Sequence, residues 1–315
     1  MKRRHFLGAT LALPAAAPFS AWAQGVKRVG FLVTGDPEPT WSLFRKGMVE
    51  VGYGEGRSVA YDYRSIAAPG LKLDEAAAEL AHFKVDVIVA ILTPAVAAAR
   101  RATSTFPIAW LGADLQVTGI GSLSRPEGNV TGVLSPSSTL AGKGLQLFHE
   151  IRPATRLFGL LLNPGDPFHV PLRRDVETVA QAEEIDLAVE LPKSRDGIGA
   201  SLDALIRRGV AGVMVQPSVG LDIAARLALE KRIPAISFRR EFVEHGGLMS
   251  YSSDYADLTR ILARQVDKLL KGVPPGNIPV QQSTRFEMIV NRKTAAALGI
   301  TLPATFLART DEVIE

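Results

Sequence analysis

The chain of 315 residues contains no cysteine. This absence excludes disulfide scaffolds, thiolate metal sites, cysteine nucleophiles and an N-terminal cysteine that carries a lipid. Histidine is scarce as well, and its five copies lack the spacing of a metal site: His5, His82, His149, His169 and His245. We therefore expect no metal and no cofactor.

The short motifs of common catalytic and nucleotide sites are also absent. The sequence has no HExxH, no GxSxG and no GxxxxGK[ST], and Gly119-Ile120-Gly121 does not continue as GxGxxG. No catalytic residue is predicted. A secreted α/β enzyme, such as a hydrolase or an epimerase, is therefore the least favoured function.

Positive charge is concentrated at the N-terminus. Lys2, Arg3 and Arg4 precede an apolar stretch that starts at Phe6, and residues 21–23 (AWA) have the small-x-small pattern of a cleavage site. We predict a signal peptide over residues 1–23, in which the adjacent arginines resemble a twin-arginine export signal. The mature protein is then expected in the periplasm, with no lipid anchor.

Little charge of one sign remains beyond this leader. The formal net charge falls from +4 to +1, because the leader holds three basic and no acidic residues. No basic tract is left that indicates nucleic-acid binding. Pro14 and Pro18 interrupt the leader's apolar run, which is short for a membrane span, so we favour export over a membrane anchor and expect a soluble mature chain.

The remaining sequence has globular composition, with 47% hydrophobic and 22% charged residues. Runs rich in valine, isoleucine and leucine alternate with alanine-rich amphipathic stretches, which is typical of an α/β fold with parallel sheets. A first series of predicted strands covers residues 26–33, 58–63, 85–91, 107–111 and 129–134, with helices at 41–51, 71–83 and 95–103. After a helix at 139–151, a second series of strands covers residues 157–162, 187–191, 210–215, 235–238 and 248–251.

The second series repeats the first in order. VDVIVAILTP (Val85–Pro94) is similar to VAGVMVQPS (Val210–Ser218), and GNVTGVLS (Gly128–Ser135) is similar to GGLMSYSS (Gly246–Ser253). Two further pairs keep the order, residues 28–37 with 156–167 and residues 106–112 with 233–238. We therefore predict a duplicated architecture in which two sheets face each other across a cleft.

The tail KLLKGVPPGNIPVQQSTRFEMIVNRKTAAALGITLPATFLARTDEVIE (Lys268–Glu315) resembles the end of the ABC transporter substrate-binding protein family that includes tryptophan- and tyrosine-type receptors. MVEVGYGEGRSV, SRPEGNVTGV and EFVEHGGLMSY also fit the family pattern, so the resemblance spans essentially the whole mature chain. The chain departs from the pattern after Gly112 and after Tyr251. Both departures touch the expected cleft, so the ligand is not copied from a relative.

The resemblance implies a bilobed fold like that of type I periplasmic binding proteins, with two doubly wound parallel sheets, a hinge and an interlobe cleft. We assign residues 24–135 to a first lobe with a return segment at about 254–278, and residues 136–253 to a second lobe with a C-terminal segment at about 279–315. The expected partners are a small-molecule ligand, amino-acid-like or an aromatic acid, and the membrane permease and ATPase of an ABC importer. A ligand-sensing receptor for a signalling partner is the alternative, and the protein is expected to be monomeric.

The resemblance also places five residues on loops that line the family's cleft, namely Thr93, Thr131, Asn163, Ser218 and Tyr251. In an amino-acid-like ligand, the carboxylate would suit hydroxyl groups and helix N-termini such as those at Thr93 and Ser218. Helix capping without ligand contact explains these two residues equally well.

Five further residues complete the predicted ligand-binding set. Thr34 lies on the loop after the first strand. Asp114 and Asp254 are candidate partners for a ligand ammonium, although Asp254 is also a good helix cap. Trp41 and Phe168 hold matching positions after the first strand of each series and are candidates for stacking on a flat ligand.

Overall fold

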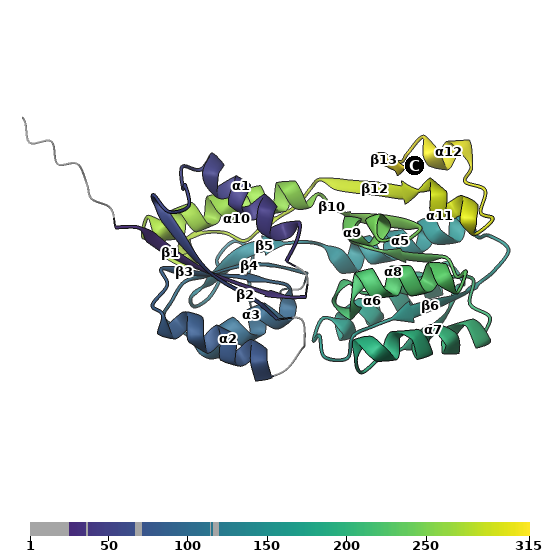
Figure 1. The fold of residues 1–315 in the computed structure, drawn as a ribbon, viewed down its shortest axis with the longest axis horizontal. Helices are drawn as coiled ribbons and strands as arrows, with labels where there is room; N and C mark the ends of the chain where they lie inside the picture. Colours follow the sequence, from purple (N-terminus) through teal and green to yellow (C-terminus); the bar gives the residue numbers. More distant parts are fainter. Residues whose placement is uncertain (1–24, 36, 67–70, 114, 116–119) are drawn as a thin grey trace, which may run out of the picture.

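The structure is a computed structural model that describes residues 25–35, 37–66, 71–113, 115 and 120–315 (Figure 1). The predicted signal peptide and Asp114 lie outside the described residues. Two α/β lobes stand side by side, each with one sheet between layers of helices. No helix among the described residues is long and apolar enough to cross a membrane.

The first sheet contains six strands in the order β11-β5-β4-β3-β1-β2, and every neighbouring pair is parallel. Its strands are β1 (Lys27–Thr34), β2 (Val59–Ile66), β3 (Val87–Ile91), β4 (Ile108–Gly112), β5 (Val130–Leu134) and β11 (Gln281–Gln282). Its helices are α1 (Thr40–Glu50), α2 (Leu71–His82), α3 (Thr93–Ala102) and α10 (Tyr255–Leu270). Figure 1 shows α10 lying beside α1 although the two helices are far apart in sequence.

The second sheet contains seven strands in the order β13-β12-β10-β9-β8-β6-β7. Its strands are β6 (Leu157–Leu161), β7 (Asp186–Glu190), β8 (Val213–Val215), β9 (Ala235–Ser237), β10 (Met249–Ser253), β12 (Phe286–Asn291) and β13 (Glu312–Ile314). Its helices are α5 (Ser137–Ile151), α6 (His169–Ala182), α7 (Ile198–Arg207), α8 (Leu221–Glu230), α9 (Arg240–Glu244), α11 (Arg292–Ala297) and α12 (Ala304–Leu307). The sheet is mostly parallel, as predicted, and the pair β10–β12 is antiparallel.

Each sheet is apolar on both faces, as expected for strands covered by helices on two sides. In β3, Val87, Val89 and Ile91 contact the core under α1 and α10, whereas Ile88 and Ala90 contact the core under α2 and α3. This two-residue period follows from the alternation of side chains along a strand. The second sheet is likewise covered by separate cores on its two faces.

The predicted repeat is present in the topology. The first five strands are ordered β2-β1-β3-β4-β5 in one lobe and β7-β6-β8-β9-β10 in the other. The similar segments therefore hold equivalent positions, since β3 corresponds to β8 and β5 to β10. The carboxyl ends of both sets of strands face the boundary between the lobes.

The chain crosses between the lobes three times, and a buried serine lies at each crossing. Ser135 follows β5, Ser253 ends β10 and Ser283 precedes β12. The Ser135 and Ser253 hydroxyls are hydrogen-bonded at 3.1 Å, and the Ser283 backbone N–H donates to Leu134 at 3.3 Å. Gln281–Gln282 form β11 of the first sheet, although the prediction assigned the segment at about 279–315 to the second lobe. The lobe boundaries as a whole stay a prediction.

Candidate functional site

Two connected cavities lie between the lobes at the carboxyl ends of the strands. The outer cavity has a volume of about 450 Å³ and the inner cavity about 30 Å³. They share Leu92, Pro217 and Ser218 as lining residues. A cleft at the ends of parallel strands is where open α/β sheets hold small ligands.

The outer cavity carries polar side chains from both lobes among apolar lining residues. The first lobe contributes Thr34 and Glu38, and the second lobe contributes Asn163, Lys193 and Arg195. One terminal nitrogen of Arg195 donates to both carboxylate oxygens of Asp222 at 2.8 Å, so this ion pair stays within the second lobe. The Thr34 hydroxyl is buried without a hydrogen-bond partner among the described residues, so it is free to bond a ligand.

The inner cavity combines aromatic rings with hydroxyl groups. Phe168 and Phe238 line it from the second lobe, and Tyr255 lines it from the start of α10. Thr93 and Ser137 contribute hydroxyls, and both are the first residues of helices that begin at this cavity. Such a site offers an apolar surface together with donors at one end.

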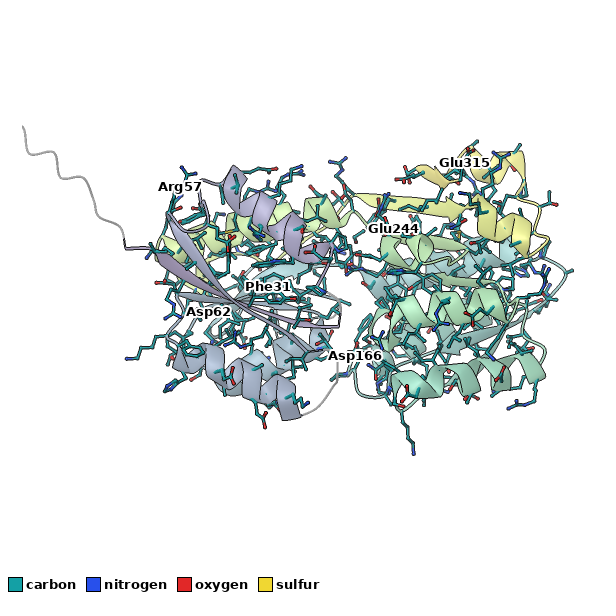
Figure 2. The ribbon with its side chains drawn as sticks, in the orientation of Figure 1. Phe31, Arg57, Asp62, Asp166, Glu244 and Glu315 are labelled. Atoms are coloured by element: carbon teal, nitrogen blue, oxygen red, sulfur yellow. The ribbon has the colours of Figure 1, made fainter. Side chains whose placement is uncertain are left out.

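Asp166 is the acidic side chain that lines the inner cavity in the described part of the chain. It is 4% exposed, and Figure 2 shows it at the edge of the second lobe that faces the first. Its Oδ2 accepts hydrogen bonds from Ser218 Oγ at 2.6 Å and from Gln216 Nε2 at 2.9 Å, and its Oδ1 accepts from the Phe168 backbone N–H at 3.0 Å. Burial raises the pKa of Asp166, and these donors together with His169 oppose the shift.

Thr93 lies opposite, in the first lobe, at the N-terminus of α3. Leu92 before it has a positive φ of 68°, and Pro94 follows within the first turn. The first turn of a helix leaves backbone N–H groups without intrahelical partners, so this end of α3 is electropositive and suits an anion, although Pro94 itself contributes no N–H. The Thr93 side chain is 3% exposed and lines the cavity.

Asn163 and Ser218 hold the loops of the second lobe together. The Asn163 backbone N–H donates to Gln216 Oε1 at 2.9 Å, and Asn163 Nδ2 donates to the Ser218 carbonyl at 2.9 Å. Asn163 Oδ1 also accepts from the Gly165 N–H at 2.9 Å. These bonds fix the loops after β6 and β8 so that the Asp166 carboxylate keeps one position.

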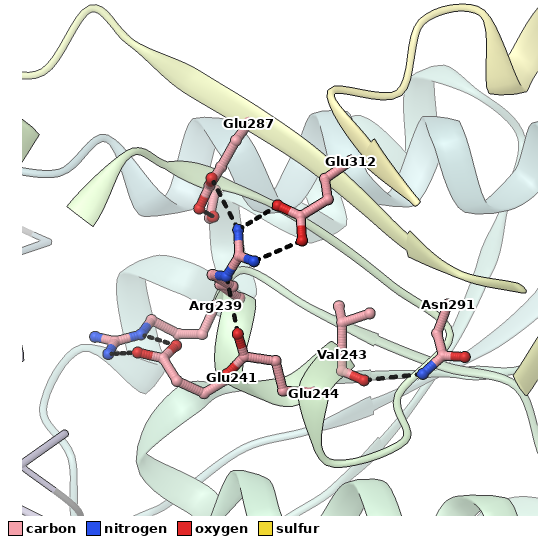
Figure 3. A network of polar contacts seen from close by, with 9 residues as sticks. Arg239, Glu241, Val243, Glu244, Glu287, Asn291 and Glu312 are labelled. Carbon is pink, nitrogen blue, oxygen red and sulfur yellow. Dashed lines mark hydrogen bonds and ion pairs between the residues drawn. The ribbon is translucent and has the colours of Figure 1, made fainter. Parts of the chain in front are cut away.

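A buried ion pair closes one side of the outer cavity. Arg239 Nε donates to Glu241 Oε2 at 2.9 Å, and a terminal nitrogen of Arg239 bonds the other oxygen (Figure 3). Burial acts to lower the pKa of Arg239, but Glu241 outweighs it and the pKa is raised. Burial acts to raise the pKa of Glu241, and Arg239 holds it below the usual value. Both groups are therefore charged at neutral pH.

The predicted residues divide into those at the cleft and those elsewhere. Thr34, Thr93, Asn163, Phe168 and Ser218 line the two cavities. The other described members of the set are Trp41, Thr131, Tyr251 and Asp254.

These four residues contact other parts of the protein. The Trp41 ring packs 4.8 Å from the Phe31 ring, centroid to centroid, in the first lobe. Thr131 is fully buried in β5 and donates to the Ile278 carbonyl at 2.7 Å. Tyr251 lines a separate groove, and Asp254 caps α10 by accepting from the Asp257 N–H at 3.1 Å. The ligand role of all these residues stays a prediction, and Asp114 lies outside the described residues.

Sequence reasoning missed Asp166, Gln216, Arg239 and Glu241. The segment Asn163-Pro164-Gly165-Asp166 follows the first strand of the second series, in the place where Thr34-Gly35-Asp36 follows the first strand of the chain. Comparison of the two repeats could therefore have drawn attention to Asp166. Nothing in the sequence pattern distinguished the pair formed by Arg239 and Glu241 from surface charges. Among the described residues, no cluster of histidine, aspartate and glutamate suits a metal ion.

Comparisons with known proteins give a consistent result. The sequence profile described as ABC transporter substrate binding protein matches residues 39–314. A tyrosine-binding protein from Clostridioides difficile (strain R20291) is 25% identical over 264 residues, which cover 82% of this chain and 75% of that protein.

Two solved structures share the fold. A conserved domain protein from Vibrio cholerae is 24% identical and has a TM-score of 0.84, and an ABC domain from Streptococcus pneumonia in complex with L-Trp is 23% identical and has a TM-score of 0.83. Each alignment covers 92% of this chain and 100% of the solved chain. The fold is that of the type I periplasmic binding proteins.

Proposed function

The chain belongs to the ABC transporter substrate-binding protein family, and on that basis we propose that it binds an amino-acid-like ligand or an aromatic acid between its lobes. This family consists of solute-binding proteins and not of enzymes. We further propose that the leader exports the protein to the periplasm, where it delivers its ligand to the permease and ATPase of an importer.

One observation carries the choice of ligand class. The N-terminus of α3 with Thr93 and the carboxyl group of Asp166 line the inner cavity from opposite lobes, and they suit an anion and a cation respectively. An α-amino acid carries a carboxylate and an ammonium on neighbouring atoms, so one head group satisfies both. Because the two groups belong to different lobes, the ligand makes both contacts only when the cleft is closed.

The rings at the inner cavity support a ligand with an apolar or aromatic part. Phe168, Phe238 and Tyr255 present apolar surface beside the proposed head-group site, and such surfaces favour offset or edge-to-face ring contacts. The relatives agree with this choice, since one is a tyrosine-binding protein and another was solved with L-Trp.

Calorimetric titration of the mature protein tests this proposal. The panel should contain the twenty amino acids together with indole- and phenyl-substituted carboxylic acids, and native mass spectrometry should first detect any ligand that remains bound after purification. We expect at least one amino acid to bind with micromolar affinity, which corresponds to about −8 kcal/mol. No binding across the panel would contradict the proposed ligand class.

Two variants separate the head-group contacts. Thr93→Val removes a hydroxyl from the anion side, and Asp166→Asn removes the charge from the cation side. We expect each change to weaken binding by about tenfold or more, because a hydrogen bond to a charged group contributes about 1.5–3 kcal/mol. Lys72→Ala, at an exposed position of α2, is the control that should bind like the wild type. Unchanged affinity in both cleft variants would place the ligand elsewhere.

A further inference from the structure

Arg239 contacts both lobes at once. It follows β9 in the second lobe and is 6% exposed. Its terminal nitrogen donates to Thr40 Oγ1 at 3.2 Å, and its Cζ lies 3.7 Å from the centroid of the Tyr255 ring. Thr40 begins α1 and Tyr255 begins α10, and both helices belong to the first lobe.

The charge of Arg239 is already balanced within its own lobe. Glu241 accepts two hydrogen bonds from the guanidinium, and both side chains are nearly inaccessible to solvent. The guanidinium therefore needs no ligand anion to be buried here. What the first lobe adds is the Tyr255 ring and the Thr40 hydroxyl, which are an aromatic face and an acceptor.

These contacts depend on how the lobes are arranged. The Arg239–Glu241 pair lies wholly in the second lobe and is kept when the lobes separate. The Tyr255 and Thr40 contacts cross the cleft, so they are lost when it opens and water then covers the guanidinium. Arg195 offers the comparison, because it lines the same outer cavity but bonds Asp222 on its own lobe.

We infer that Arg239 is an interlobe latch, a positioning residue that stabilises the closed arrangement of the lobes even without ligand. This inference rests on the proposed function only in that closure is the step which traps the ligand. The latch lowers the free-energy cost of closure, so it raises the apparent affinity for any ligand that binds the closed form. It also makes the ligand-free protein a mixture of closed and open forms, with the closed form well populated.

The absence of cysteine makes the test direct. Lys72 on α2 and Arg207 on α7 are exposed, lie on different lobes and can each be replaced by cysteine for nitroxide labelling. Pulsed electron paramagnetic resonance then gives the distribution of distances between the lobes in the ligand-free protein. We expect a major short-distance population in the labelled wild-type background.

The informative variant is Tyr255→Leu combined with Thr40→Val, because it removes both cross-cleft contacts and leaves the buried ion pair intact. We expect the ratio of short to long distances to fall by about tenfold, which is the order of effect of a desolvated cation–π contact. Tyr255→Phe keeps the ring and should retain the short population. Arg195→Met is the matched control, since it removes an arginine of the same cavity whose hydrogen bonds, among the described residues, go to Asp222 on its own lobe, and it should leave the distances unchanged.

Two outcomes would overturn the latch, namely a ligand-free wild type with only the long distance, or a double variant with the wild-type distribution. Circular dichroism of each variant confirms that it is folded. L-Tryptophan and L-tyrosine are then added to the same samples. If neither binds, these two amino acids are excluded as ligands and the full calorimetric panel decides the proposed ligand class, whereas the ligand-free distances test the latch in either case.

Discussion

Asp166 is the side chain at which function and stability oppose each other. Its carboxylate is buried at the inner cavity, and burial raises its pKa above the usual value of about 4 for aspartate. Three donors hold it in place without removing the cost of burying the charge. A buried carboxylate that lowers the stability of the fold is expected where that carboxylate contacts a ligand.

The sign of the pH dependence follows from the direction of this shift. The folded protein binds the proton more tightly than the unfolded chain, so the folded state is favoured below about pH 4 and loses that advantage as pH rises through the raised pKa. We expect Asp166→Asn to remove this loss. Its free energy of unfolding relative to the wild type should increase from about pH 4 upward and then level off above the raised pKa.

Denaturant unfolding of both proteins at a series of pH values measures this difference. Asp175→Asn, at a half-buried position of α6, is the matched control. A difference between Asp166→Asn and the wild type that does not vary with pH would show that the carboxylate is not held at a raised pKa.

How far single residues could be predicted depended on the local signals that they carry. Thr93 and Ser218 follow strands and precede helical turns, and both line the cavities. Tyr251 has the same kind of position in sequence, but the strand alternation of β10 directs it to the groove beside Phe286. The partners of Arg239 come from three separate segments, so no local pattern could reveal its burial.

At the scale of single helices, a glycine of α5 is tightly packed against its neighbour, whereas a glycine of α7 is not. A Cβ added to Gly142 in α5 would lie 2.7 Å from Cγ2 of Val179 in α6, so this glycine allows the two helices to approach closely. A Cβ on Gly199 in α7 would meet only Leu227 at 3.8 Å, which is an ordinary contact. The same substitution should therefore have opposite effects in the two helices.

We expect Gly199→Ala to raise the free energy of unfolding by about 0.5–1 kcal/mol, because alanine is the better helix former. Gly142→Ala should lower it by about 1–3 kcal/mol, since the added methyl group overpacks the interface of α5 and α6. Thermal and denaturant unfolding of the two variants measure both effects. Destabilisation by the two changes alike would contradict this account of the helix packing.

Two buried serines of β10 differ in their hydrogen bonds, which leads to a second prediction at this scale. The Ser253 hydroxyl bonds Ser135 across two crossings of the hinge at 3.1 Å, whereas the buried Ser250 hydroxyl has no partner among the described residues. Ser253→Ala should cost about 0.5–1.5 kcal/mol of unfolding free energy. Ser250→Ala on the same strand should be neutral or stabilising, because it removes an unsatisfied polar group.

Urea unfolding curves of the two alanine variants compare these hydroxyls. Equal effects from the two substitutions would show that the Ser135–Ser253 bond does not contribute to hinge stability.

The order of elements was largely predictable from the sequence, because buried parallel strands are continuous apolar runs and covering helices are amphipathic. All ten predicted strands are present, and the duplicated order placed equivalent strands correctly. The strands β11, β12 and β13 were not predicted. The strand β11 is only two residues long, and β12 pairs with β10 through contacts distant in sequence, so hydropathy gives no signal for its antiparallel direction.

At the scale of the whole molecule, two similar lobes bring their strand ends to one cleft. The lobes are connected by three short crossings, so closure requires changes at few backbone positions. The proposed head-group contacts are divided between the lobes at the inner cavity, and Arg239 adds a contact between the lobes. If the ligand binds only the closed arrangement, as proposed, ligand binding and lobe closure form one coupled equilibrium.

A consequence for the whole protein is ligand-dependent stability. A ligand at one hundred times its dissociation constant should add about 2.7 kcal/mol to the free energy of unfolding, because it binds only the folded protein. Thermal denaturation with and without the amino acid identified by calorimetry measures this gain, and Thr93→Val should reduce it at the same ligand concentration. An unchanged melting temperature at saturating ligand would contradict specific binding to the folded state.

The most direct test of the account is a crystal structure of the mature protein with the amino acid that binds it. We predict electron density for the ligand across the two connected cavities, with its carboxylate at the N-terminus of α3 beside Thr93 and its ammonium at Asp166. Density on another surface, with both cavities filled only by solvent at saturating ligand, would contradict the claim that the two lobes close on their solute.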